Sequence, residues 1–204
     1  MSEYKVVDLI SEIKDFLILK NLTSKKTLEN QITTPELIQP GLALAGYFEH
    51  FYPNRIQVLS RAEVSYLRTV TTKKLKKILE FHHDYNIPAF ILTSCGTSMD
   101  KRIIRVFNQY NISLIESTSN LDITVTALSG FLHDKFAESI SLHGVLMDVF
   151  GVGILISGIS GIGKSECALD LIERRHRLVA DDLVIGKKIS GMLIGGSLNS
   201  PLKF

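Results

Sequence analysis

One octapeptide of the chain has the residue types and the spacing to hold a phosphate group. It fits the pattern G-x-x-x-x-G-K-[ST] at every fixed position. Its residues are Gly158, Ile159, Ser160, Gly161, Ile162, Gly163, Lys164 and Ser165. The three glycines let the backbone curve around an anion so that successive N–H groups point inward. A phosphate-binding loop is therefore predicted, with a triphosphate or pyrophosphate as its ligand.

The last two residues of this loop have separate chemical roles. Lys164 is a compact positive charge that can reach the outer phosphate oxygens. The Ser165 hydroxyl can coordinate a magnesium ion that bridges the same oxygens. A nucleotide with Mg²⁺ is the ligand that this pair predicts.

The segments on either side of the loop support this prediction. Residues 152–157 are apolar and predict a buried strand, and residues 166–175 predict a helix with Ala168, Leu169, Leu171 and Ile172 on its apolar side. The helix N-terminus adds a partial positive charge at the loop. A glycine-rich turn that matches by chance is the alternative, and the strand–loop–helix order argues against it.

Three more polar residues are candidates for the same site. Asp181 and Asp182 end a short strand, 177–180, that follows the helix. In a parallel strand–helix–strand unit this strand ends at the sheet edge that carries the loop, so one carboxylate could act as a general base and the other could hold magnesium. A solvated turn is the alternative for the pair. His143 starts an apolar strand, and both a proton-transfer role and a purely structural role remain open.

The rest of the chain alternates strands and helices, which predicts an α/β fold with a parallel sheet. Helices are expected at 6–19, 71–82, 100–110 and 122–137, and strands at 55–59, 87–94 and 113–115. A second unit starts near Glu138, where two apolar runs meet in a hairpin at Phe150 and Gly151. The predicted domains are an N-terminal α/β unit, 1–137, and a phosphate-loop unit, 138–204.

One predicted helix carries an unusual set of charges. The lysines of helix 71–82 are Lys73, Lys74, Lys76 and Lys77. They are interpreted as a solvated face, with an anionic partner as the less favoured alternative. His82 and His83 close the helix, where a positive imidazole would be favourable.

Composition excludes several classes of protein. The 204 residues carry 23 Lys plus Arg and 21 Asp plus Glu, a net charge of +2 that gives no reason to expect a nucleic acid or a membrane surface as partner. Cys95 and Cys167 lack the spacing of a zinc site. The start of the chain lacks a signal-peptide core, and no apolar run is long enough to span a membrane. A cytoplasmic protein is expected.

Three ordered motifs resemble the bifunctional HPr kinase/phosphorylase family. They are residues 141–151, the phosphate loop with Glu166, and residues 176–182. Residues 40–48 and 55–57 are similar to the N-terminal domain of the family. The resemblance covers about residues 3–182 and implies a regulatory N-terminal α/β domain followed by a P-loop kinase domain, which here is incomplete.

The resemblance also implies a reaction and a set of roles. The family phosphorylates a serine of the phosphocarrier protein HPr with ATP or pyrophosphate, and removes that phosphate by phosphorolysis. Asp181 resembles the residue that exchanges a proton with this serine, Lys164 the residue that neutralises the transferring phosphoryl group, and His143 an active-site neighbour. Ser165 resembles the magnesium ligand, and Asp182 keeps the magnesium-holding role inferred above for one carboxylate of the pair. A cytoplasmic homohexamer that acts in carbon catabolite repression is implied as well.

The chain departs from the family pattern in three places. Ile159 replaces an aspartate in the loop, and Arg175 replaces a glycine that ends the next helix. After Asp182 the similarity is weak, and the family's Leu-Glu-Ile-Arg-Gly signature, with its magnesium-binding glutamate, catalytic arginine and subunit contacts, is absent. A fragment or truncated relative is inferred, with nucleotide binding but weak or absent phosphoryl transfer. The alternatives are an inactive nucleotide-binding or interaction module and an unrelated phosphate-loop ATPase.

Overall fold

The computed structural model describes residues 3–49, 51–94, 99–189 and 191–197. Contacts between Cα atoms divide the chain into two compact units, Met1–Phe136 and Ala137–Phe204. Within the described ranges, no helix combines the length and the apolar character that crossing a bilayer requires.

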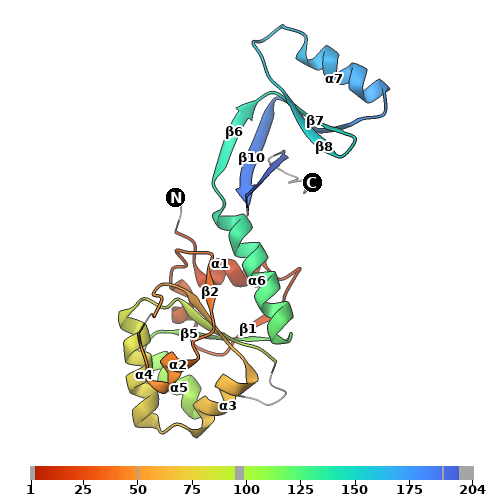
Figure 1. Ribbon diagram of the computed structural model, residues 1–204. Helices are drawn as coiled ribbons and strands as arrows, with labels where there is room; N and C mark the ends of the chain where they lie inside the picture. The colour runs from red at the N-terminus through yellow and green to blue at the C-terminus, as the bar shows by residue number, and fades with distance from the viewer. Residues whose placement is uncertain (1–2, 50, 95–98, 190, 198–204) are drawn as a thin grey trace. The chain divides into compact units, whose positions relative to one another are not determined.

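The first unit is built on a five-stranded sheet in the order β1-β5-β4-β3-β2 (Figure 1). Its strands are β1 (Leu19–Asn21), β2 (Leu37–Ile38), β3 (Ile56–Leu59), β4 (Ala89–Leu92) and β5 (Ser113–Ser117). Strands β2 to β5 are parallel, and β1 is antiparallel at the β5 edge. The parallel α/β fold that the alternating pattern predicts is therefore confirmed for this unit.

Helices cover both faces of this sheet because its inner strands are apolar on both faces. In β4, Phe90 and Leu92 belong to one buried cluster and Ala89 and Ile91 to another. The first cluster includes residues of α3 (Arg61–Thr69), α4 (Thr72–Asp84) and α5 (Lys101–Gln109), and the second includes residues of α1 (Val6–Glu12) and α6 (Leu121–Phe136). Two short helices, η1 (Lys25–Glu29) and α2 (Leu42–Ala45), lie in the connections between the strands.

The structure corrects two of the expected elements in this unit. The helix expected over residues 6–19 ends at Glu12, and Leu19 instead begins β1 opposite Ser117. Phe16 and Ile18, which lie between these elements, are 71% and 64% exposed. Helix α3 was not predicted, although Ser60 and Glu63 form a capping box at its start.

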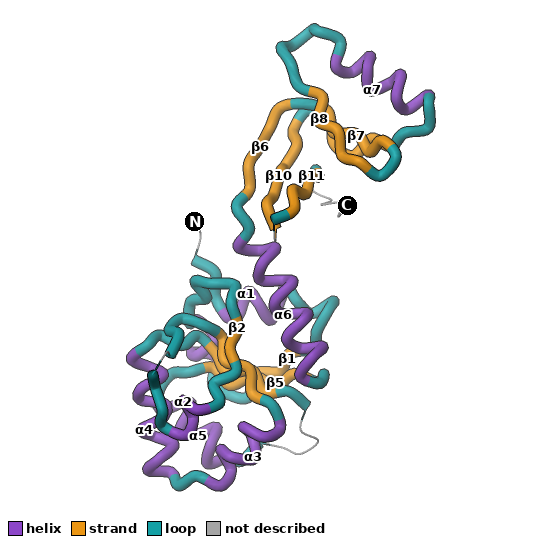
Figure 2. Tube along the Cα trace, viewed as in Figure 1, coloured by secondary structure: helices purple, strands orange, loops and turns teal. Residues whose placement is uncertain are grey.

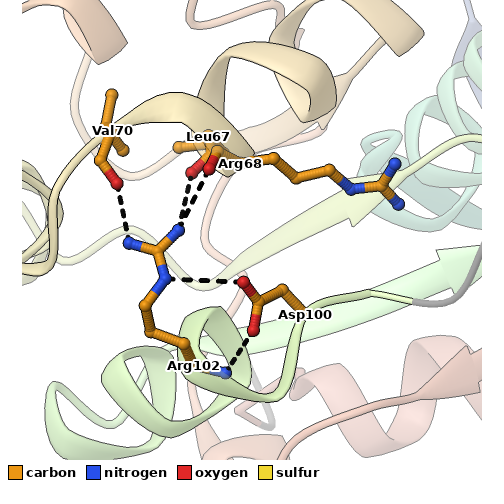
Figure 3. Close-up of polar contacts among 5 residues, drawn as sticks. All are labelled: Leu67, Arg68, Val70, Asp100 and Arg102. Carbon is orange, nitrogen blue, oxygen red and sulfur yellow. Dashed lines mark hydrogen bonds and ion pairs between the residues drawn. The ribbon is translucent and has the colours of Figure 1, made fainter.

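Arg102 ties the end of α3 to the start of α5 (Figure 3). Its guanidinium group donates hydrogen bonds to the carbonyl oxygens of Val70 at 2.7 Å, Arg68 at 3.3 Å and Leu67 at 3.4 Å. The Asp100 carboxylate accepts from the Arg102 backbone N–H at 2.7 Å and from its Nε at 3.4 Å. The carbonyl groups at the C-terminus of α3, which lack intrahelical donors, therefore gain partners from another helix.

The two histidines at the end of α4 differ in their environment. His83 is exposed, as a solvated helix end requires, but His82 is fully buried among aromatic rings, including those of Phe51 and Phe90. Burial lowers the pKa of His82 to about 4, against the smaller opposing effect of a hydrogen bond to the Ile78 carbonyl oxygen. The expectation of a positive imidazole is therefore wrong for His82, which is neutral near pH 7.

The described residues of the second unit form two three-stranded sheets and one helix (Figure 2). One sheet has the order β8-β7-β9 and the other β11-β10-β6. The elements are β6 (Ser139–His143), β7 (Val145–Val149), β8 (Val152–Ile156), α7 (Lys164–Glu173), β9 (Arg177–Ala180), β10 (Leu183–Ile189) and β11 (Met192–Gly196). Strands β7 and β8 form the predicted hairpin, with Phe150 and Gly151 at its turn. The expectation that the strand before the loop is buried is wrong, because Val152, Ile154 and Leu155 on β8 are exposed.

Helix α7 begins where the phosphate loop ends, but its apolar side is only partly covered. Ala168 is buried and Leu171 packs against the cluster of Val145 and Met147 on β7. Leu169 and Ile172, which were expected on the covered side, are 60% and 40% exposed. Among the described residues, the sheet covers only one face of this helix.

Candidate functional site

The order of the strands brings the ends of β8 and β9 to the same edge of their sheet. Both strands pair antiparallel with β7, which lies between them, so β8 and β9 run parallel to each other. The phosphate loop follows the end of β8, and Asp181 follows the end of β9. A strand–loop–helix–strand unit with this arrangement places the loop and the acidic pair at one edge.

The two sheets of the second unit are linked at the same place. The chain passes between the sheets once at Gly144, between β6 and β7, and again at Asp181 and Asp182, between β9 and β10. The Gly144 N–H donates to the Asp182 carbonyl oxygen at 3.2 Å, which joins these two corners. Asp182 has a φ of 64°, a left-handed conformation that aspartate adopts more readily than most residues. This corner holds the acidic pair beside the end of β8.

A cavity of about 330 Å³ opens at this corner. The residues that line it are His143, Gly144, Val145, Gly158, Ser160, Lys164, Ser165, Asp181 and Asp182. The structure thus brings together the histidine, the two carboxylates, the lysine and the two serines that the sequence suggested for one site. The remaining loop residues, Ile159, Gly161, Ile162 and Gly163, do not line this cavity.

The loop has the backbone conformation that an anion cradle requires. Gly161 and Gly163 have φ values of 79° and 98°, in the region that favours glycine. Gly163 is the N-cap of α7, and no side chain caps this helix, so the first-turn N–H groups remain free for an anion. Lys164 Nζ donates to the carbonyl oxygens of Gly158 and Ile159, each at 3.0 Å, which holds its charge over the loop.

His143 and Asp181 are held by backbone pairing rather than by side-chain contacts to one another. His143 is the last residue of β6 and pairs with Leu183 on β10, directly after the acidic pair. The Asp181 carboxylate accepts from the Asp182 N–H at 3.0 Å, and the Asp181 carbonyl oxygen accepts from the Leu183 N–H at 2.8 Å. The side chains of His143, Asp181 and Asp182 are exposed, so they are accessible to a ligand in the cavity.

Gly144 is a site residue that sequence reasoning missed. A Cβ atom at this position would lie 2.6 Å from the Ile156 carbonyl oxygen and 3.2 Å from Leu155 Cδ1. Only glycine allows the β6–β7 corner to approach the end of β8 this closely. A glycine between two apolar strands was the available signal, because it marks a bend or a close backbone approach.

Arg175 shows what the missing helix-ending glycine changes. Its φ is 69°, and it occupies the position after the C-cap of α7. The N–H groups of Arg175 and His176 donate to the carbonyl oxygens of Ile172 and Leu171, at 2.8 and 3.0 Å, which is the hydrogen-bond pattern of a Schellman motif. Arginine therefore adopts the left-handed conformation that glycine would adopt without steric strain.

Family models match both units of the chain. The model described as "HPr Serine kinase N terminus" matches residues 5–132, and "HPr Serine kinase C-terminal domain" matches residues 134–203. This chain belongs to the HPr serine kinase family. The second match extends past Asp182, so the similarity continues beyond the point at which the sequence motifs alone ended.

Individual members of the HPr serine kinase family support the assignment. The HPr kinase/phosphorylase of Alkaliphilus metalliredigens is 38% identical over 187 residues, which are 92% of this chain and 60% of the relative. That of Clostridium perfringens strain SM101 is 40% identical over 185 residues, 91% of this chain and 59% of the relative. The chain thus spans about 60% of the length of these relatives.

The chain also matches part of a solved structure. The HPr(Ser) kinase/phosphatase from Coxiella burnetii is 37% identical to the part of this chain that it matches. The match covers 30% of this chain and 38% of that protein, with a TM-score of 0.29.

The donor atoms at the corner could hold phosphate groups and a magnesium ion. A hydroxyl at Ser165 and a carboxylate at Asp182 are oxygen donors, which magnesium prefers. Within the ranges that the structure describes, no group of three or more His, Cys, Asp or Glu side chains could hold a metal ion. A magnesium ion here would take its remaining ligands from phosphate oxygens and water, as it does in many phosphoryl-transfer sites. Cys167 is free and exposed on α7, and Cys95 lies outside the described residues.

Proposed function

We propose that the second unit binds ATP or pyrophosphate with Mg²⁺ and transfers a phosphoryl group to a serine of the protein HPr. The observation that carries the proposal is the cavity at the ends of β8 and β9. It is lined by residues of the phosphate loop, including Lys164 and Ser165, and by the two carboxylates of Asp181 and Asp182. The relatives are named HPr kinase/phosphorylase, which supplies the acceptor. The reverse reaction, attack of inorganic phosphate on phosphoserine to give pyrophosphate, belongs to the same proposal.

The residues at the cavity divide the work of such a transfer. The N–H groups of residues 158–165 and the start of α7 hold phosphate oxygens, and Lys164 moves from the loop carbonyls to neutralise the transferring group. Ser165 and Asp182 would hold a magnesium ion, which would offset the charge of the phosphate groups. Ile159 and Ile162 are 77% and 64% exposed and contribute their backbone to the loop rather than their side chains.

Asp181 is proposed as the group that exchanges a proton with the serine. In the forward direction it accepts the hydroxyl proton as the serine oxygen bonds to phosphorus and the bond to the departing phosphate breaks. In the reverse direction it returns that proton to the serine oxygen. His143 lines the same cavity and is proposed to orient or hydrogen-bond the reacting groups.

The first unit is proposed to regulate the second, and the family pattern further suggests a cytoplasmic homohexamer. These statements are proposals about the whole protein. The chain spans about 60% of the length of its relatives. A second candidate function is nucleotide binding without phosphoryl transfer. Family membership removes the third alternative, an unrelated ATPase.

The test separates nucleotide binding from phosphoryl transfer on one sample. Calorimetric titration of the 204-residue chain with MgATP should show binding, and Lys164→Ala should weaken it by about tenfold or more, because a charge-assisted contact is lost. Asp181→Asn should leave binding within about twofold of the parent but abolish HPr phosphorylation. Absence of MgATP binding by the parent chain would refute the proposal. Binding without phosphorylation in the parent chain would select the second candidate.

A further inference from the structure

The first unit contains a second cavity, which is larger than the cavity at the phosphate loop. Its volume is about 410 Å³, within the range of small-molecule sites, about 300–1,000 Å³. It lies at the edge of the sheet where strands β3, β4 and β5 begin. Its lining residues Asn54, Pro88 and Ile112 each come one or two residues before one of these strands. It is therefore formed entirely within this unit.

The polar lining of this cavity is dominated by side-chain amides. Asn54, Asn86 and Asn111 line it together with Asn30 and Gln31. The five amides offer both hydrogen-bond donors and acceptors. Among the described residues that line it, none is Asp, Glu, Lys or Arg, and the titratable side chain is that of His83.

Three of these amides come from backbone positions of a special kind. Asn54, Asn86 and Asn111 have φ values of 61°, 52° and 52°. Among the described residues these are all the asparagines with positive φ, and all three line this one cavity. Glycine would satisfy the left-handed backbone with less strain. At Asn54 and Asn86 the asparagine also supplies a side-chain amide that makes no hydrogen bond to a described residue, whereas the Asn111 amide donates to Asn30 Oδ1 at 3.2 Å.

Several of the polar groups in the lining are free to bind a ligand. The side chains of Gln31, Thr33, Asn54 and Asn86 make no hydrogen bond to a described residue. Asn30 acts differently, because its Nδ2 donates to the carbonyl oxygens of Asn111 at 2.8 Å and Pro88 at 3.1 Å and so holds two of the turns together. The cavity thus combines a fixed frame with uncommitted donors and acceptors.

The charge and shape of the cavity define the kind of ligand. Helices α4 and α5 end at Asp84 and Gln109, two residues before the lining residues Asn86 and Asn111, and the partial negative charge of helix C-termini disfavours an anion. Ile87, Pro88 and Ile112 are largely buried and form its apolar part. An apolar surface with neutral amides around it suits a ring that has C–H faces and hydroxyl groups at its edge.

We propose that this amide cavity, lined by the residues named above, binds a small uncharged polyol of the size of a monosaccharide. Such a ligand would bind to the unit that we propose to be regulatory, at a site separate from the phosphate loop. Failure of this proposal would leave the nucleotide site unaffected, because the two cavities lie in different units.

Side-chain amides give a direct readout of binding. In ¹H–¹⁵N spectra of the labelled 204-residue chain, titration with D-glucose, D-mannose and myo-inositol should shift asparagine NH₂ signals of the cavity. At least one of these probes should bind, with a Kd of roughly 1–10 mM for so small a ligand. D-Glucuronate, which has the same ring with a carboxylate, should bind at least about tenfold more weakly, because the helix ends disfavour its charge.

The variant that tests the site is Asn54→Gly/Asn86→Gly. Glycine keeps both left-handed turns and removes two uncommitted amides, so the fold is retained while probe binding should weaken about tenfold. Arg175→Gly makes the same kind of replacement at a left-handed position of the other unit and should leave probe binding unchanged. The proposal is overturned if none of the three neutral probes shifts the cavity amides, if the double variant binds as the parent does, or if glucuronate binds equally well.

Discussion

Gly144 sets the distance between the phosphate loop and the acidic pair. A Cβ atom at residue 144 would lie 2.6 Å from the Ile156 carbonyl oxygen, and the residue's N–H bonds to Asp182. Both neighbours are backbone groups, which cannot rotate away as a side chain can. The backbone at 144 is therefore a spacer between the two halves of the proposed site.

Gly144→Ala should weaken MgATP binding by about tenfold, because the end of β8 must move away from Asp182, and it should destabilise the second unit by about 1–3 kcal/mol. The matched control is Gly153→Ala in β8, where a Cβ would meet only Leu146 Cδ1 at 3.9 Å, an ordinary contact. Calorimetric titration, at a temperature where both variants are folded, measures the difference. MgATP binding that is equal in the two variants would contradict the spacer role.

His82 makes the stability of the first unit depend on pH. Its folded-state pKa is about 4, lowered mainly by burial, against about 6.5 when unfolded. The unfolded chain therefore binds a proton at a higher pH than the folded chain does. The stabilising effect of a neutral His82 is complete above about pH 6.5 and is lost as the pH falls toward 4.

Between pH 7 and pH 5, His82 should reduce the free energy of unfolding by about 2 kcal/mol, as linkage between pKa values of about 6.5 and 4 requires. His82→Phe should remove this part of the pH dependence, since Phe51, Phe81 and Phe90 already surround the position with aromatic rings. Urea denaturation at the two pH values measures it. His83→Gln, at an exposed site, serves as the control, and an equal loss of pH dependence in both variants would show that burial at His82 is not the cause.

At the scale of elements, helix ends are fixed by single residues from distant parts of the chain. Arg102 supplies donors to the C-terminus of α3 while its own helix begins at Asp100 (Figure 3). Arg102→Lys keeps the charge but loses the planar fork that reaches several carbonyl groups at once. We expect it to destabilise the first unit by about 1–2 kcal/mol in denaturant titrations.

Arg105→Lys is the control for this prediction, because Arg105 is exposed on the same helix. Its effect should be smaller than about 0.5 kcal/mol. Equal effects of the two substitutions would mean that the contacts of Arg102 with α3 do not contribute.

Local patterns predicted the elements whose signals are local. The loop at 158–165 and the hairpin at Phe150 follow from residue types within a few positions of each other. The end of the first helix could not be predicted in this way, because β1 depends on pairing between Leu19 and Ser117, which are far apart in the sequence. The placement of β7 between β8 and β9 is likewise a non-local property, and periodicity does not encode it.

The candidate site was predictable to the extent that motif residues define it. Lys164, Ser165, Asp181 and Asp182 were proposed as neighbours from strand order, and they line one cavity. Gly144 was missed because its requirement comes from the carbonyl oxygen of Ile156, which only the folded structure brings near. Burial of His82 was missed because a helix-end position gives no information about the aromatic side chains around it.

At the scale of the whole chain, the two units differ in how completely they are packed. The first unit has large buried clusters on both faces of its sheet, whereas the clusters of the second are small, and Val152 and Ile154 on β8 remain exposed. Amide hydrogen exchange should therefore be slower in β3, β4 and β5 than in β7, β8 and β9, because local opening is easier where few apolar contacts resist it.

MgATP should slow exchange in residues 157–166 and leave the first unit unchanged, since ligand binding stabilises the state that binds it. Mass spectrometry of peptides after timed exchange resolves these segments. Faster exchange in β3 to β5 than in β7 to β9 would show that packing does not determine the order of opening, and protection by MgATP confined to the first unit would place nucleotide binding outside the corner at Asp181 and Asp182.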